Sequence, residues 1–538
     1  MKFYQFLKNE SGKPLLKLFL LTALSGLASA GVLAIINLAA KNVSKDSFNI
    51  SYILMFASVV GIFVTSQKFI LTNGILVIEE ILNNIRLRLS DKIRRTDLLN
   101  IEQIGKAEIY NRLTQECTLI SQMAPYIINA LQSAIMLIFV FGYIAFLSLI
   151  AAIVLLILIL IGVLVFHKNN IKVYAELEET NKAEIKFFEA LTDILDGLKE
   201  IKLNRKKSND LYSYFETVSL KLKELKISTG NKFSENMVFS QAFIYIVLGA
   251  IVFVMPRISP DMSDKVVSTT TAMLFAIGPL TSIVSMLPVF GKVNIAIKNI
   301  YSLESELDLQ VNPNEVQPIN GANRFTGFNK IALKDIYFEY KNGDEKEVFS
   351  IGPIDITLNR GEVLFVIGGN GCGKTTFLKV LTMLYRPKAG NIFVDDRLVD
   401  SANYLEYREL YSAIFYDFHL FDKLYGLEKV EPQKINELLK LMQIDNKTEF
   451  VDNGFTKLDL STGQRKRLAL IVTFLEDKPI YIFDEWAADQ DPQFKKYFYD
   501  DLLKKLKSEG KTVIAVSHDD RYFHLADRII KMEYGKII

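Results

Sequence analysis

One nine-residue stretch, Gly368–Thr376, restricts the possible folds of this chain more than any other feature. Its sequence, GGNGCGKTT, matches the pattern G-x-x-x-x-G-K-[ST], a loop whose backbone N–H groups surround phosphate oxygens. The apolar run Val363–Ile367 before it predicts a buried parallel strand, and Thr376–Leu381 after it predicts the start of a helix. The stretch therefore predicts the strand–loop–helix unit of an α/β nucleotide-binding domain.

The residue types in this loop suggest distinct roles in binding ATP. The side chain of Lys374 is expected to reach the β- and γ-phosphates, and the hydroxyl of Thr375 is expected to bind magnesium. The glycines let the backbone close around the phosphates, and the helix N-terminus adds positive dipole charge. The candidate ATP-binding residues here are Gly368, Gly369, Asn370, Gly371, Cys372, Gly373, Lys374, Thr375 and Thr376.

Two further apolar runs end in polar residues that suit nucleotide chemistry. Ile480–Phe483 is followed by Asp484 and Glu485, and Val513–Val516 is followed two residues later by His518. We expect Asp484 to hold magnesium, Glu485 to polarise a water against the γ-phosphate, and His518 to donate to that phosphate. Because the carboxyl ends of parallel strands meet at one edge of a sheet, we expect a single site there. The candidate catalytic residues are Lys374, Glu485 and His518.

Long apolar stretches before residue 305 predict a membrane domain, since half of all residues are hydrophobic and they are concentrated there. A spanning helix needs about 20 apolar residues. The block Tyr126–Val165 is too long for one helix, so it predicts two helices joined by a turn near Ser148. Six spans surrounded by membrane lipid are expected: Leu18–Ala40, Ile50–Leu76, the two halves of Tyr126–Val165, Val238–Met255 and Thr270–Val289.

The distribution of charge predicts the orientation of these spans. Lys and Arg are concentrated in 79–122 and 168–232, which places both of these stretches and both termini in the cytoplasm. Charged residues are nearly absent from the spans, with Lys68 as the exception. The polar residues of the spans can serve helix–helix hydrogen bonding or line a substrate path, and both roles remain open. They are Asn129, Gln132, Gln241, Thr269, Thr270 and Thr271.

Charge balance, cysteine spacing and local composition limit the possible partners, the possible metal or disulfide sites and the domain boundaries. The 63 Lys and Arg nearly balance the 61 Asp and Glu, so no nucleic-acid partner is expected. The two cysteines, Cys117 and Cys372, are far apart, which argues against a disulfide framework or a zinc site. We expect a membrane domain over 1–305, a linker over 306–328 that is rich in Asn, Pro and Gly, and an α/β ATPase domain over 329–538.

The stretch Leu460–Gln464, LSTGQ, resembles the LSGGQ signature of ABC transporter ATPases, with Thr462 in place of the first glycine. The resemblance covers the whole chain and implies an ABC exporter half-transporter: an α-helical six-span transmembrane domain followed by an α/β P-loop ATPase domain. In that family the signature of one subunit caps ATP bound to the other, so a second identical subunit is expected. Tyr340 matches the aromatic residue that stacks on adenine. The signature residues expected to act in trans are Ser461, Thr462, Gly463 and Gln464.

The residues after the catalytic glutamate narrow the resemblance. The segment Asp484–Pro492, DEWAADQDP, departs from the Ser-Ala-Leu-Asp-like stretch of most ABC ATPases, although Asp491 keeps the last position of that D-loop. It looks like the cyclic-peptide exporter family, which includes half-transporters for lasso-peptide microcins, pyoverdine-type siderophore precursors and syringomycin-type lipopeptides. The resemblance implies ATP-driven export of a peptide or peptide-derived natural product across a bacterial inner membrane.

Three other functions remain open on the sequence. A lipid or multidrug exporter of the same architecture would carry the same nucleotide motifs, and so would an importer of this fold, for instance for siderophores. The third is a membrane-tethered relative of the soluble ABC ATPases of repair or translation. Such proteins usually carry two ATPase domains in one chain, whereas this chain has one.

One position departs from the wider family. Most ABC ATPases bind magnesium there with a glutamine side chain, and alignment on Leu420-Phe421 places this position at Tyr416. Because magnesium prefers carboxylate oxygens, we expect Asp417 to take this role and Tyr416 to pack against the membrane domain. Contacts between the domains are expected near Lys106–Thr114 and Asn204–Tyr214. The candidate magnesium ligands are Thr375, Asp417 and Asp484.

Overall fold

The computed structural model describes residues 3–10, 16–42, 50–254, 257, 266–309, 323–340, 349–427 and 430–538. The chain divides into two compact units. The helical unit consists of Met1–Ser90 and Ala107–Glu306, and the α/β unit consists of Asp91–Lys106 and Leu307–Ile538. Much of the predicted linker, 310–322, lies outside the described residues.

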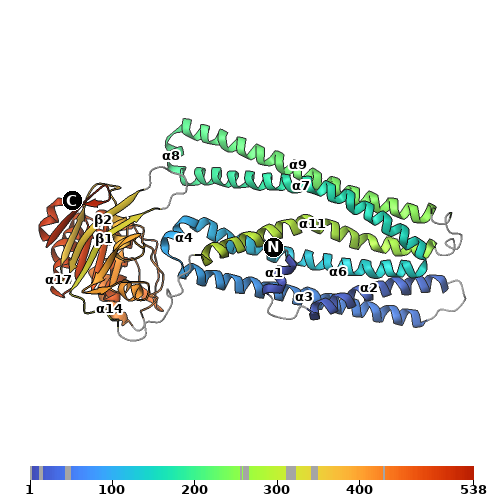
Figure 1. Ribbon diagram of the computed structural model, residues 1–538, viewed down its shortest axis with the longest axis horizontal. Helices are drawn as coiled ribbons and strands as arrows, with labels where there is room; N and C mark the ends of the chain where they lie inside the picture. The colour runs from blue at the N-terminus through green and yellow to red at the C-terminus, as the bar shows by residue number, and fades with distance from the viewer. Residues whose placement is uncertain are drawn as a thin grey trace. The chain divides into compact units, whose positions relative to one another are not determined.

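Long apolar helices make up the helical unit (Figure 1). Five helices of the described residues are long and apolar enough to cross a membrane, and the described apolar start of α7, Leu149–Gly162, is shorter. The helices up to Asp308 are α1 Phe3–Glu10, α2 Leu16–Asn42, α3 Ile50–Arg95, α4 Leu98–Ile104, α5 Lys106–Tyr110, η1 Asn111–Glu116, α6 Cys117–Leu147, α7 Leu149–Asp196, α8 Leu198–Leu203, α9 Arg205–Gly249, η2 Ala250–Val254 and α11 Val266–Asp308.

The turn predicted near Ser148 is confirmed. Ser148 has φ −158° and ψ 117°, an extended conformation that ends α6 at Leu147 and lets α7 begin at Leu149. Its Oγ accepts a hydrogen bond from the backbone N–H of Ala151 over 3.3 Å, which caps α7. The apolar block therefore forms two helices rather than one.

Two helix pairs run side by side in the helical unit (Figure 1): α2 with α6, and α7 with α9. A Cβ atom on Gly162 of α7 would lie 2.5 Å from the ring of Phe243 of α9, so this close approach requires a glycine. A shared apolar core then joins several of the helices. It includes Leu33 of α2, Ile144 of α6, Leu155 of α7, Val247 of α9 and Ala272 of α11.

A six-stranded sheet in the order β12-β11-β3-β10-β9-β6 forms the centre of the α/β unit. β11, β3, β10, β9 and β6 are parallel, and β12 pairs antiparallel with β11. The three strands predicted from the apolar runs are confirmed as β3, β9 and β10. The bounds are β3 Val363–Ile367, β6 Tyr411–Ile414, β9 Ile480–Asp484, β10 Thr512–Val516, β11 Arg528–Glu533 and β12 Lys536–Ile537.

Both faces of this sheet are buried, which explains the uninterrupted apolar strands. In β3, Leu364 and Val366 join one core, and Val363 and Phe365 join the other. The first core includes the four-stranded antiparallel sheet β2-β1-β4-β5 and α12, and the second includes α14 and α15. The remaining bounds are β1 Lys330–Glu339, β2 Ser350–Asn359, α12 Lys374–Leu381, β4 Ala389–Val394, β5 Arg397–Leu398, α13 Tyr404–Arg408, α14 Pro432–Leu441, β7 Phe450–Val451, β8 Gly454–Phe455, α15 Thr462–Glu476, η4 Trp486–Asp489, α16 Pro492–Tyr497, η5 Phe498–Leu502, α17 Leu503–Ser508 and η6 Asp520–Leu525.

The short helix α4 belongs to the α/β unit although it follows the long α3 in sequence. Leu98 and Leu99 pack against the first core, and Glu102 accepts hydrogen bonds from Tyr385 and from Lys379, the latter over 3.0 Å. The contacts between the domains that the sequence predicted near Lys106–Thr114 and Asn204–Tyr214 stay predictions. Leu98 and Leu99 lie within the charged stretch 79–122, so their packing against the core could not be predicted from the local sequence.

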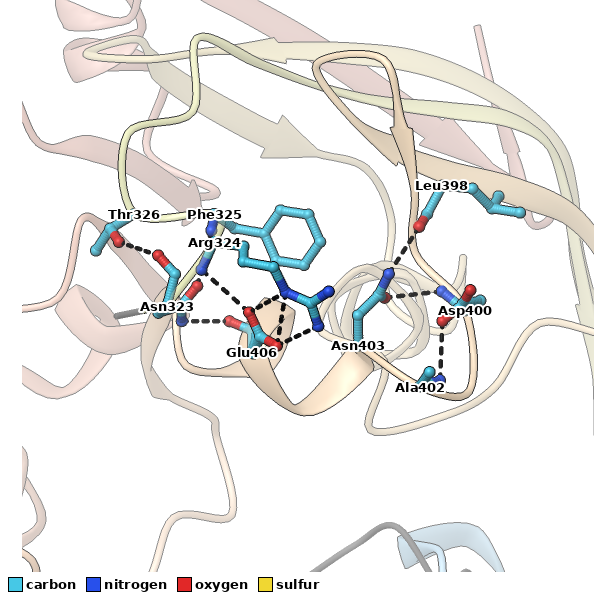
Figure 2. A network of polar contacts seen from close by, with 9 residues as sticks. All are labelled: Asn323, Arg324, Phe325, Thr326, Leu398, Asp400, Ala402, Asn403 and Glu406. Atoms are coloured by element: carbon cyan, nitrogen blue, oxygen red, sulfur yellow. Dashed lines mark hydrogen bonds and ion pairs between the residues drawn. The ribbon is translucent and has the colours of Figure 1, made fainter. Parts of the chain in front are cut away.

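The described chain re-enters the α/β unit at Asn323, where a polar network attaches it to α13 (Figure 2). The guanidinium of Arg324 donates to the carboxylate of Glu406, with Nε 2.9 Å from Oε2. Asn323 Nδ2 donates to the main-chain oxygen of Glu406 over 2.7 Å. The hydrogen bonds from Arg324 lower the pKa of Glu406, and Phe325 is buried in the first core beside them. This segment therefore fixes the start of the α/β unit.

Candidate nucleotide-binding site

Four loops converge at one edge of the six-stranded sheet. Val516 of β10 pairs with Val366 of β3 on one side and with Asp484 of β9 on the other, and Ile414 of β6 pairs with Phe483. Because these strands are parallel and in register, the loops after them begin at the same level. Three of the preceding strands were predicted from apolar runs, and the structure adds β6 as the strand before the predicted residues Tyr416 and Asp417. The loops contribute 368–376, Ser517 and His518, Glu485, and Tyr416 and Asp417.

Two of the predicted magnesium ligands are in contact. Thr375 Oγ1 donates to Asp484 Oδ2 over 2.8 Å, and Asp484 is only 1% exposed. Burial raises the pKa of the Asp484 carboxyl, and the hydrogen bond from Thr375 opposes that shift. A divalent cation beside this carboxylate would offset its desolvation, and a carboxylate with a hydroxyl is a donor set that suits magnesium. The residues present therefore fit the predicted ion.

The ammonium group of Lys374 lies inside the phosphate loop. Its Nζ donates to the carbonyl oxygens of Gly368 and Gly369, each over 3.0 Å. Gly368 has φ 149°, and a Cβ atom there would lie 2.3 Å from the carbonyl oxygen of Met532, so only glycine fits against β11. Hydrogen bonds to charged acceptors are stronger than those to neutral carbonyls, so phosphate oxygens can displace both glycine carbonyls from the ammonium.

Tyr340 follows β1 and lies beside the helix that continues the phosphate loop. Its hydroxyl lies 3.1 Å from the hydroxyl of Thr376 at the start of α12. Its ring packs near Phe349, with 6.3 Å between ring centroids, and edge-on against Tyr385. The aromatic ring predicted to stack on adenine is thus next to the loop that would hold the phosphates, and the stacking itself stays a prediction.

The two predicted catalytic side chains Glu485 and His518 are hydrogen-bonded to each other. His518 Nε2 and Glu485 Oε1 are 3.1 Å apart, with 45% and 29% of the side chains exposed. A cavity of about 210 Å³ borders both residues. Glu485 has φ 51° and ψ 33°, a left-handed conformation that costs roughly 1–2 kcal/mol for a residue with a side chain. The arrangement can hold a water against an accessible carboxylate.

A buried lysine that the sequence did not point to holds this strained backbone. Lys466 of α15 is 1% exposed, and its Nζ donates to the main-chain oxygen of Glu485 over 2.8 Å. The same Nζ lies 2.7 Å from Oδ2 of Asp489, and the indole N–H of Trp486 donates to the carbonyl of Lys466 over 2.9 Å. The ring of Tyr416 is 5.7 Å from the ammonium, within cation–π range. The available signal was DEWAADQDP, whose unusual Trp486 and Asp489 are the partners of this lysine.

The signature residues contact the same segment. Thr462 begins α15, and Ser461 and Gln464 form a capping box at its N-terminus. Gln490 Nε2 donates to the carbonyl of Gly463 over 3.1 Å, and a Cβ atom on Gly463 would lie 2.7 Å from the carbonyl oxygen of Asp489. Within the described ranges, no hydrogen bond links these residues to the phosphate loop.

Arg467 fixes the end of that segment to α15. Its Nε donates to Gln490 Oε1 over 2.9 Å, and its guanidinium pairs with the carboxylate of Asp491 and lies 3.8 Å from the ring centroid of Phe494. The N–H of Phe494 and the charge of Arg467 lower the pKa of Asp491. Asp491 caps α16 through that N–H, so the predicted D-loop residue is held from two sides.

Tyr416 and Asp417 are consecutive residues of the turn after β6. The backbone N–H of Tyr416 lowers the pKa of the Asp484 carboxyl, so the backbone of Tyr416 lies near the predicted magnesium site. Both side chains are exposed, Tyr416 by 64%. The magnesium role of Asp417 and the packing of Tyr416 against the membrane domain stay predictions.

The fold and this site define an ABC-type ATPase joined in one chain to apolar helices. The sequence model of the ABC transporter family matches residues 351–488. The ATP-binding protein SyrD of Pseudomonas syringae pv. syringae is 31% identical to this protein, and the similarity covers 98% of this chain and 94% of SyrD. The chain therefore belongs to the ABC transporter family, which confirms the family predicted from the LSTGQ and phosphate-loop motifs.

Two further comparisons match different lengths of the chain. A bacterial Atm1-family ABC exporter solved with ATP bound has the same fold, with a TM-score of 0.77 over 97% of this chain and 94% of its own, at 15% identity. The choline transport ATP-binding protein OpuBA of Bacillus subtilis is 28% identical over 39% of this chain and 56% of its own length. The protein is thus a member of the ABC transporter family with the fold of an ABC exporter, and its ATPase is coupled to transport.

Replacing Glu485 with glutamine should lower the turnover number for ATP by about two orders of magnitude, because the carboxylate that polarises water is lost. ATP binding should remain, and a closed dimer should accumulate. Lys374→Ala should instead weaken ATP binding, because the phosphates lose the ammonium. Steady-state ATPase assays and equilibrium ATP binding on purified protein separate these effects. Near-normal turnover of Glu485→Gln would overturn the assignment.

Lys466→Met should lower the turnover number about tenfold with little change in KM for ATP, because Glu485 loses the donor that holds its carbonyl. The matched control is Lys505→Met on α17, whose side chain is 65% exposed in a long pair with Glu509. That control should leave turnover unchanged. Equal turnover per folded molecule in both variants would show that Lys466 does not position the site.

Proposed function

We propose that this protein exports a peptide or a peptide-derived natural product, such as a cyclic peptide, lasso peptide, siderophore precursor or lipopeptide, across the bacterial inner membrane. The observation that carries the proposal is the DEWAADQDP segment, which resembles that of cyclic-peptide exporters. The contacts of Asp489 and Gln490 with α15 support it, because residues of this unusual segment pack against the helix that begins at the signature. The similarity to SyrD along both units supports it as well.

ATP hydrolysis rests on five residues at the sheet edge. ATP would supply the γ-phosphate, and magnesium would neutralise part of the negative charge on its oxygens. The ammonium of Lys374, which now contacts the glycine carbonyls, would bind the phosphate oxygens, and Thr375 and Asp484 would hold the magnesium ion. Glu485 orients and polarises the attacking water, while His518 fixes that carboxylate and donates to the γ-phosphate.

A second identical subunit completes each ATP site. Each chain has one phosphate loop and one signature, so one chain supplies half of each of two sites. Ser461 and Gly463 lie at the N-terminus of α15, where the backbone N–H groups and the helix dipole attract an anion. They would meet the γ-phosphate of ATP held by the partner, and the homodimer would close around two nucleotides.

Closure of the dimer would reach the membrane through α4. Leu98 and Leu99 pack into the α/β unit, and Glu102 is hydrogen-bonded to Tyr385 and Lys379. ATP binding would thereby favour one of two transporter states, and hydrolysis would restore the other. The charge distribution supports a multi-pass protein of the inner membrane with both termini and the ATPase domain in the cytoplasm.

The magnesium site provides a first test. Asp417→Ala should raise the magnesium concentration needed for half-maximal ATPase activity, because a carboxylate ligand of the ion is lost. Tyr416→Phe is the matched control and should leave that requirement unchanged, since it keeps the ring and the backbone N–H. ATPase activity is measured against magnesium concentration in each variant. The reverse pattern would place the side chain of Tyr416 at the nucleotide instead.

The dimer is tested by mixing two inactive subunits. Ser461→Arg and Lys374→Ala each inactivate both sites of a homodimer, but a heterodimer of the two keeps one intact composite site. Heterodimers isolated through two different affinity tags should regain up to about half of the activity, as expected for one site of two. Full activity of a monomer, or heterodimers as inactive as either homodimer, would refute action in trans.

Transport is tested in inside-out vesicles. ATP should drive uptake of a cyclic hexapeptide with uncharged side chains, and vesicles with Glu485→Gln should show none because hydrolysis is blocked. Fluorescent phospholipid and a cationic dye serve as competing cargoes. Uptake of the lipid or the dye without the peptide would replace the proposal with a lipid or drug exporter. Uptake of the peptide in right-side-out vesicles only would indicate an importer.

A further inference from the structure

A cavity of about 570 Å³ lies in the helical unit among α2, α3, α6 and α11. This size is in the range of small-molecule binding sites. Its polar lining consists of uncharged amides and hydroxyls, and no charged residue is among the described residues that line it. The polar lining residues are Ser29, Gln67, Asn129, Gln132, Ser133 and Ser282.

Aromatic and apolar side chains form the rest of the lining. Phe63 of α3, Met136 of α6 and Phe275 of α11 are among them. Apolar walls with a few convergent polar groups are the usual composition of a ligand pocket. A ligand that fits these walls presents both apolar side chains and uncharged hydrogen-bonding groups.

The amide of Gln132 is held firmly at this cavity. Gln132 is 7% exposed, and its Nε2 donates to Ser25 Oγ over 2.7 Å and to the side-chain oxygen of Gln67. These bonds join α2, α3 and α6. The role left open for Gln132 in the sequence therefore includes helix–helix hydrogen bonding, and its position also fixes the polar side of the cavity.

Asn129 has a different environment. It lies one helical turn before Gln132 on α6, lines the same cavity and has an exposed side chain. Thr271, another polar residue of the spans, instead donates to the carbonyl of Val267 in its own helix over 2.8 Å. An exposed amide is costly among apolar helices unless it meets water or a polar ligand. Asn129 is therefore the lining residue best placed to contact a cargo.

We infer that this cavity binds the backbone amides of the exported peptide, with Asn129 as a contact residue and Gln132 and Gln67 as the groups that orient it. A peptide amide presents an N–H donor and a carbonyl acceptor, and a carboxamide side chain presents an NH2 donor and a carbonyl acceptor, so the two groups can pair. The uncharged lining selects for neutral amides rather than for a charged group. This inference rests on the proposed peptide export and names the part of the substrate that is recognised.

The test uses the uncharged cyclic hexapeptide and a fully N-methylated ring of the same sequence, which lacks every backbone N–H donor. The readout is the peptide concentration that gives half-maximal stimulation of ATPase activity by the full-length protein in proteoliposomes. In the wild type, methylation should raise this concentration about tenfold. Asn129→Leu should raise it about tenfold for the unmethylated ring, as expected for loss of one hydrogen bond, and by less for the methylated ring, which has already lost its N–H donors.

Two further variants keep the test decisive. Gln241→Leu removes an exposed amide of α9 that does not line the cavity, and it should match the wild type. Asn129→Asp keeps the shape of the side chain and adds a negative charge, so it should shift the preference toward a ring that carries one lysine. Thermal unfolding of each variant checks that the protein is folded.

The outcomes distinguish failure of this binding site from failure of peptide export. If the peptide stimulates the ATPase but Asn129→Leu behaves like Gln241→Leu, or if methylation has no effect, the cavity is not the binding site and peptide export stands. If only phospholipid or the cationic dye stimulates the ATPase, peptide export is refuted, and the inference about this cavity falls with it.

Discussion

The nucleotide site depends on the pairing of β10 between β3 and β9. In that register Val516 faces Val366 on one side and Asp484 on the other, so the phosphate loop and the acidic pair start at one level. The alternation of Leu364 and Phe365 between two buried cores fixes the register, because a slip of one residue would exchange the faces. Contact between Thr375 and Asp484 follows from this backbone geometry.

Two buried cations then connect the signature helix to the catalytic segment. A buried charge is strongly destabilising without its partner, and Lys466 and Arg467 find their partners in Asp489 and Asp491. Helix α15 and the segment 485–491 therefore hold each other in place. The unusual residues Trp486 and Asp489 of DEWAADQDP both contact Lys466 of this helix. The same lysine donates to the carbonyl of Glu485, whose backbone is strained. Helix α15 therefore connects the signature at its N-terminus to the catalytic residue of the same subunit.

In the helical unit, uncharged polar residues connect neighbouring helices along their apolar lengths. Its helices are apolar, so the few amides they carry must be hydrogen-bonded or must face a polar ligand. Gln132 satisfies the first condition through Ser25 and Gln67, and Asn129 lines the cavity between the same helices. Polar residues therefore both hold these helices together and give the cavity its chemical character.

The sequence alone determined the features that lie within one stretch of chain. The phosphate loop, the three strands before the polar residues, the break at Ser148 and the signature are encoded by local periodicity and spacing, and the structure places them as expected. Tertiary structure decided what depends on residues far apart in sequence. Lys466 meets Glu485, α4 packs on the α/β unit through Leu98 and Leu99, and Tyr416 meets Asp484 only because β6 pairs with β9. Such contacts follow from how whole elements pack, and a local pattern such as DEWAADQDP marks an unusual segment without naming the residues that it will contact.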